Sequence, residues 1–292
     1  MTRKTINRTT MKKILVPCDF SDSARQAYKF AIDIAAANGG EVILVKVIDL
    51  TPVYVESLDS NPYYLHVTSV LKELEEDAWN DFEVFTKAID AKNVKVTFVT
   101  EQGTVCRTLL NQIHKQEADL VVMGTHGVHG LKEFLLGSNN GKIVQCAPVP
   151  VFVIHHAQSF SRIKNIIFPT EIDLTQNAIV EKIKALQSFF NATLHLLYIK
   201  TPVNDDKMAE LEMSLRNMAR FYDLNEFTVN VREQNSEEEG ILKFATDLSN
   251  SIIAMGTHGN KGLKHFIAGS IAESVANHSG ETIWTYSIGA QQ

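Results

Sequence analysis

The chain has little of what marks secreted, membrane-spanning or nucleic-acid-binding proteins. Its 292 residues include three cysteines, none in a CxxC spacing, so neither a disulfide framework nor a thiolate zinc site is predicted. No apolar run approaches the roughly 18 residues of a membrane-spanning helix. The 34 acidic and 28 basic side chains leave a net charge of -6. This balance argues against nucleic acid or an anionic membrane as a partner, because both require a broad positive field.

The beginning of the chain carries no recognisable secretion signal. Its first thirteen residues are basic, but the apolar run Ile14–Pro17 is too short for a signal core. Residues 1–10 offer nothing to bury, and we interpret them as a loose tail or an alternative start before Met11. The expected compartment is therefore the cytoplasm. A chain of this length with 45% apolar residues and only 7 prolines can form two globular domains.

The two halves of the chain repeat one another. Residues 123–127, Met-Gly-Thr-His-Gly, recur as residues 255–259, at an offset of 132. Nearer the start of each half the offset is 152, because Ile14–Pro17 matches Ile166–Pro169. The first half therefore contains extra residues, which we place at 53–70, as a flap, a partner surface or an extension of the second helix. The repeat predicts two copies of one domain, over residues 11–155 and 162–289.

Hydrophobic periodicity predicts alternating strands and helices in each copy. The strands are almost wholly apolar, which is typical of a parallel sheet covered on both faces. The predicted fold class is therefore α/β, with two tandem doubly wound sheets. In the first copy we expect strands over 12–17, 41–48, 94–100, 119–123 and 149–154, and helices over 21–37, 69–91, 104–116 and about 137–146. The last strand of the second copy is expected over 281–287.

Two features of each copy follow the ends of predicted strands. In the first copy they are Pro17-Cys18-Asp19, after the first strand, and the glycine-rich segment that begins at Gly124, after the fourth. Sheets of this kind bind ligands in a crevice beyond the carboxyl ends of their strands, where the winding reverses. If the first and fourth strands are neighbours, both features line one pocket.

The glycine-rich segment has a spacing that suits a phosphate. Gly124-x-x-Gly127, nine residues and then Gly137-Ser138 recur in the second copy as Gly256-x-x-Gly259, nine residues and Gly269-Ser270. Glycines allow the backbone to approach a ligand closely, and the amides that open a helix attract anions. The pattern is neither GxxxxGK[ST] nor GxGxxG. Glycines that merely form tight turns are the alternative, which the double occurrence at fixed spacing disfavours.

This pattern resembles that of the ATP-binding members of the universal stress protein (UspA) family, which also carry an aspartate after the first strand. The likeness covers residues 11–289, so the chain resembles a tandem universal stress protein. The resemblance implies Rossmann-like five-stranded sheets of order 3-2-1-4-5 and ATP, with or without Mg²⁺, between the first and fourth strands. It also implies that the fifth strands of the two copies pair within the chain as a pseudo-dimer, and a homodimer remains open.

The resemblance also implies which residues bind the nucleotide. Asp19 would lie near the adenine and ribose, and Val47 would pack on the base. The full set in the first copy is Pro17, Asp19, Val47, Met123, Gly124, His126, Gly127, Gly137, Ser138 and Asn139. The matching set in the second copy is Ile199, Met255, Gly256, His258, Gly259, Gly269, Ser270 and Ile271.

Each copy departs from the family pattern at one place. In the second copy Glu171 replaces the aspartate, and its longer side chain would spoil a fitted contact. In the first copy Asn139-Asn140-Gly141 replaces residues that would open a good helix. We favour the first copy as the nucleotide site, because its acidic residue is intact.

Other candidate chemistry in the sequence is weaker. His126, His129, His155 and His156 have no neighbouring carboxylate or cysteine cluster, which disfavours zinc. Ser138 and Ser270 lack a GxSxG elbow and suit a cap or phosphate ligand better than a nucleophile. Cys18 is interpreted as a packing residue, because Asp19 disfavours its thiolate. The acidic runs at residues 73–77 and 237–239 are interpreted as solvated helix surface.

The predicted function is a nucleotide-dependent stress-response regulator that binds ATP. No arginine finger, second carboxylate for a metal or general base is recognisable, so at most slow ATP hydrolysis is expected. Two alternatives remain open. One is an interaction protein whose pockets are degenerate, and the other is an enzyme that transfers adenylate or phosphoryl groups.

Overall fold

The computed structural model describes residues 11–49, 63–125, 138–155, 160–204, 206–257 and 268–288. Of residues 63–68, 138–140 and 268–270 it describes the backbone only. The first half contains β1 (Lys13–Pro17), α1 (Asp22–Asn38), β2 (Glu41–Ile48), α3 (Tyr63–Lys87), β3 (Lys95–Gln102), α4 (Val105–Lys115), β4 (Leu120–Gly124), α5 (Ser138–Cys146) and β5 (Val151–Ile154). A 3-10 turn, η1 (Phe160–Arg162), leads into the second half.

The second half repeats this order of elements. It contains β6 (Asn165–Pro169), α6 (Asn177–Phe190), β7 (Thr193–Lys200), α7 (Met208–Phe221), β8 (Phe227–Glu233), α8 (Glu237–Asp247), β9 (Ser251–Thr257), α9 (Ala268–His278) and β10 (Thr282–Ser287). Each predicted strand and helix of the first copy is present, with ends that shift by a few residues.

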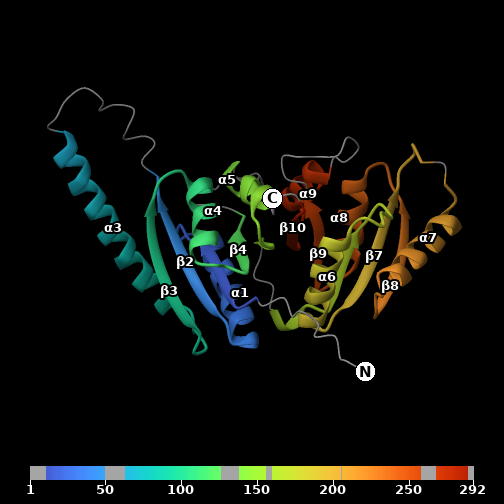
Figure 1. Ribbon diagram of the computed structural model, residues 1–292, viewed down its shortest axis with the longest axis horizontal. Coiled ribbons are helices and arrows are strands. Elements are labelled where there is room, and N and C mark those ends of the chain that lie inside the picture. Colours follow the sequence, from blue (N-terminus) through green and yellow to red (C-terminus); the bar gives the residue numbers. More distant parts are fainter. Residues whose placement is uncertain are drawn as a thin grey trace.

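The two predicted sheets are joined into one sheet of ten strands. The order is β3-β2-β1-β4-β5-β10-β9-β6-β7-β8, so the predicted order 3-2-1-4-5 is confirmed in both halves (Figure 1). Neighbouring strands within each half are parallel. The exception lies at the centre, where β5 and β10 pair antiparallel with Phe152 opposite Trp284. The predicted pairing of the fifth strands within the chain is therefore confirmed.

Alternation along the strands divides the apolar core into two layers. In β1, Ile14 and Val16 join the layer on one face of the sheet, and Leu15 joins the layer on the other. The first layer is completed by α1, α3, α6 and α7, and the second by α4, α5, α8 and α9. Both layers contain residues from the two halves. This is the pattern expected of parallel strands that are buried on both faces.

Local signals set the ends of α1, and the insertion lengthens α3. Ser21 caps α1, because its hydroxyl accepts from the amide of Ala24, and Gly39 ends the helix at φ 68°. The helix that we predicted over 69–91 begins at Tyr63 instead, so residues 63–68 of the insertion extend it. The rest of the insertion, residues 53–62, lies outside the described residues.

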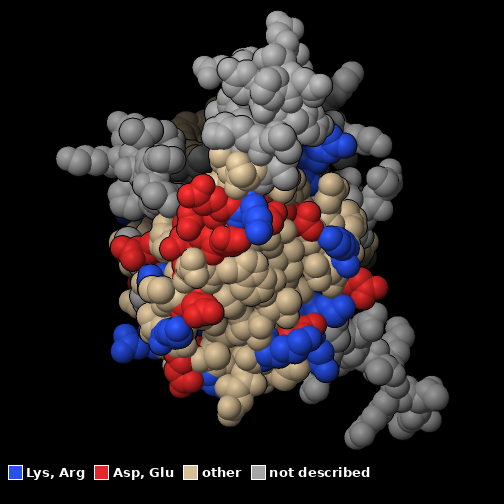
Figure 2. Space-filling model, turned by 90° about the vertical axis from the view of Figure 1, so that its left-hand side faces the viewer, with Lys and Arg blue, Asp and Glu red and all other residues tan. Residues whose placement is uncertain are grey.

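The outer face of α3 carries the acidic run that we predicted to be solvated. Glu73, Glu76 and Asp77 are exposed, and Lys72 lies 3.7 Å from Glu76. Figure 2 shows acidic and basic side chains together on this end of the molecule. The interpretation as solvated surface is therefore confirmed for these three acidic residues, whereas Glu75 is half-buried and accepts from the side-chain amide of Gln102 at 3.1 Å.

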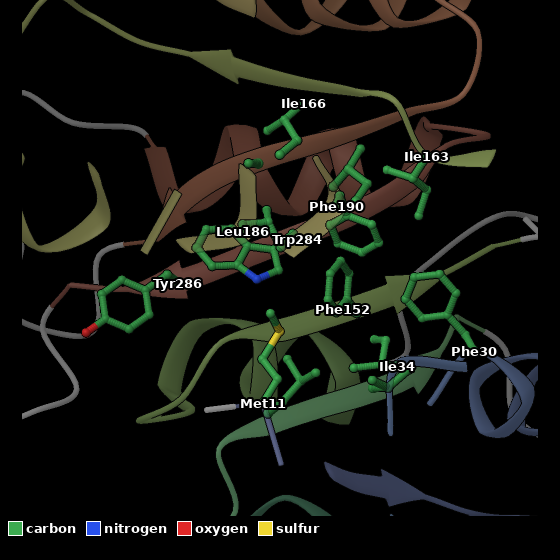
Figure 3. Close-up of a cluster of buried hydrophobic side chains, with 14 of the residues drawn as sticks. Met11, Phe30, Ile34, Phe152, Ile163, Ile166, Leu186, Phe190, Trp284 and Tyr286 are labelled. Atoms are coloured by element: carbon green, nitrogen blue, oxygen red, sulfur yellow. The ribbon is translucent and has the colours of Figure 1, made fainter. Parts of the chain in front are cut away.

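Aromatic side chains from both halves meet around the central strand pair (Figure 3). The ring of Phe152 lies 5.2 Å from that of Phe30, in the first half, and 6.3 Å from that of Phe190, in the second. Trp284 is 2% exposed in the same cluster. Because one continuous cluster fills this region, the two halves share a core there.

Polar contacts of α5 with α9 and with the end of β9 also join the two halves. The amide of Gln145 donates to Glu273 at 3.0 Å, and Thr257 donates to the carbonyl of Val144 at 3.1 Å. A Cβ at Gly141 would lie 3.0 Å from the carboxylate of Glu273, so the absence of a side chain there leaves room for this contact. This contact explains the glycine of the segment Asn139-Asn140-Gly141. The helix α5 forms although these residues are poor helix formers.

No helix within the described residues has the length and apolar character needed to cross a membrane.

Phe152→Ala should lower the free energy of unfolding by about 3–5 kcal/mol, because it removes a fully buried ring from the centre of the shared core. Equilibrium urea unfolding followed by circular dichroism measures the loss. Phe221→Ala is the matched control, since that ring is 60% exposed and should change the value by less than about 0.5 kcal/mol. Equal losses in the two variants would contradict the shared core.

Candidate functional site

The loops that follow the first and fourth strands of each half leave from the same edge of the sheet. In the first half β1 pairs with β4, through Ile14 opposite Leu120. In the second half β6 pairs with β9, through Ile166 opposite Ile252. The strands that carry the two predicted ligand features are therefore neighbours, as expected. The candidate sites lie at these carboxyl edges, where doubly wound sheets bind ligands.

In the first half, Asp19 is fixed at the start of α1. Its carboxylate accepts from the amide of Ser21 at 3.0 Å and from the hydroxyl of Ser21 at 2.5 Å. Ser21 in turn accepts from the amide of Ala24, at 3.2 Å. The carboxylate thus lies at the N-terminal end of the helix. It presents a fixed acceptor beside Pro17, the last residue of β1.

A buried thiol precedes this carboxylate in the chain, and the charge of Lys46, from the neighbouring strand β2, reaches that thiol. The ammonium of Lys46 lies 5.2 Å from the centre of the Phe20 ring, which is a cation–π distance. Its neighbour Val47 is partly buried in β2. Burial raises the pKa of Cys18 to about 12, and the charge of Asp19 contributes less to this shift. Cys18 is therefore a protonated packing residue at neutral pH, as predicted, although burial is the main cause.

The two glycines at the ends of β4 and β9 are confined differently. A Cβ at Gly124 would lie 2.6 Å from the backbone carbonyl of Ser23, so α1 approaches the strand end closely. A Cβ at Gly256 would meet only the tips of Ile179 and Ile288, at 3.0 and 3.2 Å. Gly124 is thus required by packing whether or not a ligand binds there.

The second half contains a cavity of about 320 Å³ at its carboxyl edge. Four residues of the predicted second set line it: Ile199, Met255, Gly256 and Ile271. The rest of the wall is Phe168, Pro169, Thr170, Glu171, Gln176, Ile179, Leu197, Tyr198, Glu237, Ile241 and Ile288. The volume falls in the range that holds a small organic ligand.

Two carboxyl groups face this largely apolar cavity. Burial raises the pKa of Glu171 to about 7, with smaller contributions from the charges of Glu237 and Asp173. Burial also raises the pKa of Glu237. The interpretation of residues 237–239 as solvated surface is therefore wrong for Glu237, which is half-buried in the pocket wall. The first turn of α8 turns this residue toward the sheet edge, away from bulk solvent.

The loop that carries Glu171 differs from its counterpart in the first half. In the first half the aspartate that accepts from the backbone amide two residues later is Asp19, which aligns with Glu171. In the second half this turn lies two residues further along, where Asp173 accepts from the backbone amide of Thr175 at 2.8 Å. The following helix, α6, begins at Asn177, and no side chain caps it at Gln176. Instead the hydroxyl of Tyr222 accepts from the amide of Gln176 at 2.9 Å. As a result, Glu171 takes no part in an aspartate-type turn and lines the cavity.

The structure describes only part of the predicted glycine-rich segments. Met123 is buried and Gly124 ends β4. The first turns of α5 and α9 contain the other helical members of the sets, Ser138, Asn139, Gly269 and Ser270, and only their backbone is described. His126, Gly127, Gly137, His258 and Gly259 lie outside the described residues.

Sequence reasoning missed several lining residues, chiefly Glu237, Tyr198 and Ile288. The repeat aligns the first two with Val105 and Lys46, which are not in the predicted first set, so it gave no signal for them. Ile288 follows the last strand and has no such signal.

The histidine pair that invited a metal interpretation is only half described. His155 is 9% exposed just beyond β5, and His156 lies outside the described residues. Over the parts of the chain with described positions, no three histidine, cysteine, aspartate or glutamate side chains gather as a metal would require.

Comparison with known proteins agrees with the repeat and the fold. The model of the universal stress protein family matches residues 10–155 and 162–284. The chain belongs to the universal stress protein family. It contains two such domains, in tandem.

Individual universal stress proteins show how far the likeness extends. One from Methanocaldococcus jannaschii is 32% identical over 143 residues, which are 49% of this chain and 81% of the relative. One from Synechocystis is 22% identical over 296 residues, 94% of this chain and 100% of the relative. The crystal structure of one from Archaeoglobus fulgidus covers 97% of this chain and 99% of its own, with a TM-score of 0.69 and 19% identity. The last comparison shows a shared fold.

Gly124→Ala should destabilise the chain by about 1–3 kcal/mol, because its Cβ would meet backbone atoms that can yield only if α1 moves. Gly256→Ala is the matched control, and we expect a smaller loss since the tips of two isoleucine side chains can rotate. Urea unfolding of both variants measures the difference. If the second variant lost as much as the first, the close approach of α1 to β4 would not be the constraint.

Glu171→Gln should become progressively more stable relative to the parent as the pH rises. The folded parent keeps the proton of Glu171 up to a pKa of about 7, whereas an ordinary glutamate loses it near 4.5. The parent therefore loses stability as the pH rises between these two values, and the glutamine variant does not. Thermal unfolding across this range measures the difference, and a difference that is constant or falls with pH contradicts the raised pKa.

Proposed function

We propose that the chain is an ATP-binding universal stress protein in which nucleotide occupancy of the first half sets conformation or partner choice. The observation that carries the proposal is the carboxyl edge of the first half. There a fixed carboxylate, Asp19, the end of β4 at Gly124 and the opening of α5 at Ser138 follow neighbouring strands.

The residues at the carboxyl edge of the first half have the chemical groups that an adenine nucleotide requires. Asp19 offers an acceptor for ribose or adenine hydrogen bonds, and Val47 offers apolar surface for the base. The opening of α5 supplies backbone amides, which suit a phosphate. Lys46, whose ammonium lies over the ring of Phe20, adds a positive charge from the neighbouring strand β2, which favours an anionic ligand.

The proposal is one of binding and regulation, without fast turnover. The nucleotide would supply a large bound anion whose presence or absence changes the surface around α5. Since α5 also contacts α9 through Gln145 and Glu273, a movement of α5 on nucleotide binding would also shift α9 in the second half. ATP hydrolysis is expected to be slow at most, and a time course of ADP release tests this part separately.

Equilibrium dialysis of the purified chain with ATP, with and without Mg²⁺, should give one nucleotide per chain. The double variant Gly127→Val with Gly137→Val should weaken binding by tenfold or more, about 1.4 kcal/mol, because side chains would fill the space that the phosphates need. Circular dichroism checks that the variant is folded.

The matched control is the equivalent pair in the second half, Gly259→Val with Gly269→Val, which should leave the stoichiometry at one. Nucleotide that stays bound after the first pair of substitutions would contradict the assignment to the first half. A parent chain that binds no ATP would contradict the proposed function as a whole.

A further inference from the structure

Because the chain is duplicated, the charged residues around the second pocket can be compared with the residues at the same positions of the first half. The two halves align in space at the strand ends, since the amide of Cys18 donates to Val45 and that of Thr170 to Leu197, both at 2.9 Å. These pairs share the offset of 152. Residues aligned around the two sites can therefore be compared one by one.

Of four aligned positions around the two sites, one is acidic in both halves and three differ in charge. The first half has Asp19, Ser21, Lys46 and Val105, and the second has Glu171, Asp173, Tyr198 and Glu237. One acidic and one basic side chain in the first half are thus replaced by three acidic side chains and no basic one. At these four positions the second half therefore carries two more acidic side chains and one fewer basic side chain than the first.

The acidic groups of the second half surround a cavity and have no cation among its described lining residues. Glu171 comes from the loop after β6, and Glu237 from the first turn of α8. The charge of Asp173 also reaches Glu171, and Tyr198 of β7 lies within the influence of both glutamates. The nearby Lys200 is directed to Glu233, 3.7 Å away, and is not part of the wall.

The cavity suits an organic cation better than a polyphosphate or a metal ion. Polyphosphate would meet like charge from two carboxyl groups, so the described residues of the second half do not fit ATP. Ca²⁺ and Mg²⁺ prefer six or more oxygen ligands, whereas Ile179, Ile241 and Ile288 form much of the wall. An apolar body with one ammonium group would match both the isoleucine surface and the carboxyl pair.

We infer that the pocket of the second half binds a small ring-bearing organic amine, whose ammonium group is held between Glu171 and Glu237 and whose ring packs on the isoleucine wall. This site is distinct from the proposed ATP site and does not depend on it. The tandem chain would then accept two ligands of opposite charge, one in each half.

Isothermal titration of the intact chain with tryptamine tests the inference. Tryptamine is cationic, and indole-3-propionate is an anionic probe with the same ring. We expect tryptamine to bind at one site per chain, at least tenfold more tightly than indole-3-propionate. Its affinity should rise as the pH increases through about 7, where Glu171 loses its proton, and should fall with added salt.

Glu237→Gln should weaken tryptamine binding by tenfold or more. Glu239→Gln is the matched control, because this residue lies in the same turn of α8 but is exposed and outside the pocket wall. Equal affinity for the two probes, or equal effects of the two substitutions, would overturn the inference, as would no tryptamine binding at millimolar concentration. ATP binding measured in parallel keeps this outcome separate from that of the proposed function.

Discussion

The antiparallel pairing of β5 with β10 is the constraint on which the rest of the structure depends. Every residue of β5 is buried, and so is every residue of β10. Without a partner either strand would be an exposed edge that carries large apolar side chains, which proteins cover or blunt to avoid aggregation. Pairing within one chain satisfies both edges at once. It also fixes the two halves back to back, so that Phe30, Phe152 and Phe190 share one core.

This arrangement places the two carboxyl-edge sites in a fixed relation while leaving each free to diverge. The helices that open at the two sites, α5 and α9, contact each other directly. The strands below them have kept their apolar sequences, because each strand is buried on both faces. The loops have changed instead, as the displaced aspartate turn at Asp173 shows. The two halves therefore share the framework of the sheet and differ in the loops at its carboxyl edge, as well as in the insertion that lengthens α3.

The two candidate sites differ in the charges of their aligned residues. Where the first half has Lys46, the second half has the uncharged Tyr198. Where the first half has Val105, the second half has the carboxyl group of Glu237. The longer side chain of Glu171 was expected to spoil a nucleotide contact. In the structure Glu171 instead lines the cavity beside Glu237, where burial raises its pKa to about 7. The two sites are thus chemically unlike in spite of their common fold.

The sequence by itself determined the repeat, the doubly wound class, the strand order that the family likeness implied and four residues of the second pocket. It could do so because periodicity, glycine spacing and duplication are local or internal signals. Only the tertiary structure decided that Glu237 faces a cavity, that Gly124 is confined by Ser23 and that α6 starts at Asn177. These facts depend on how a helix end meets a strand end distant in sequence, and no spacing within one segment encodes that contact.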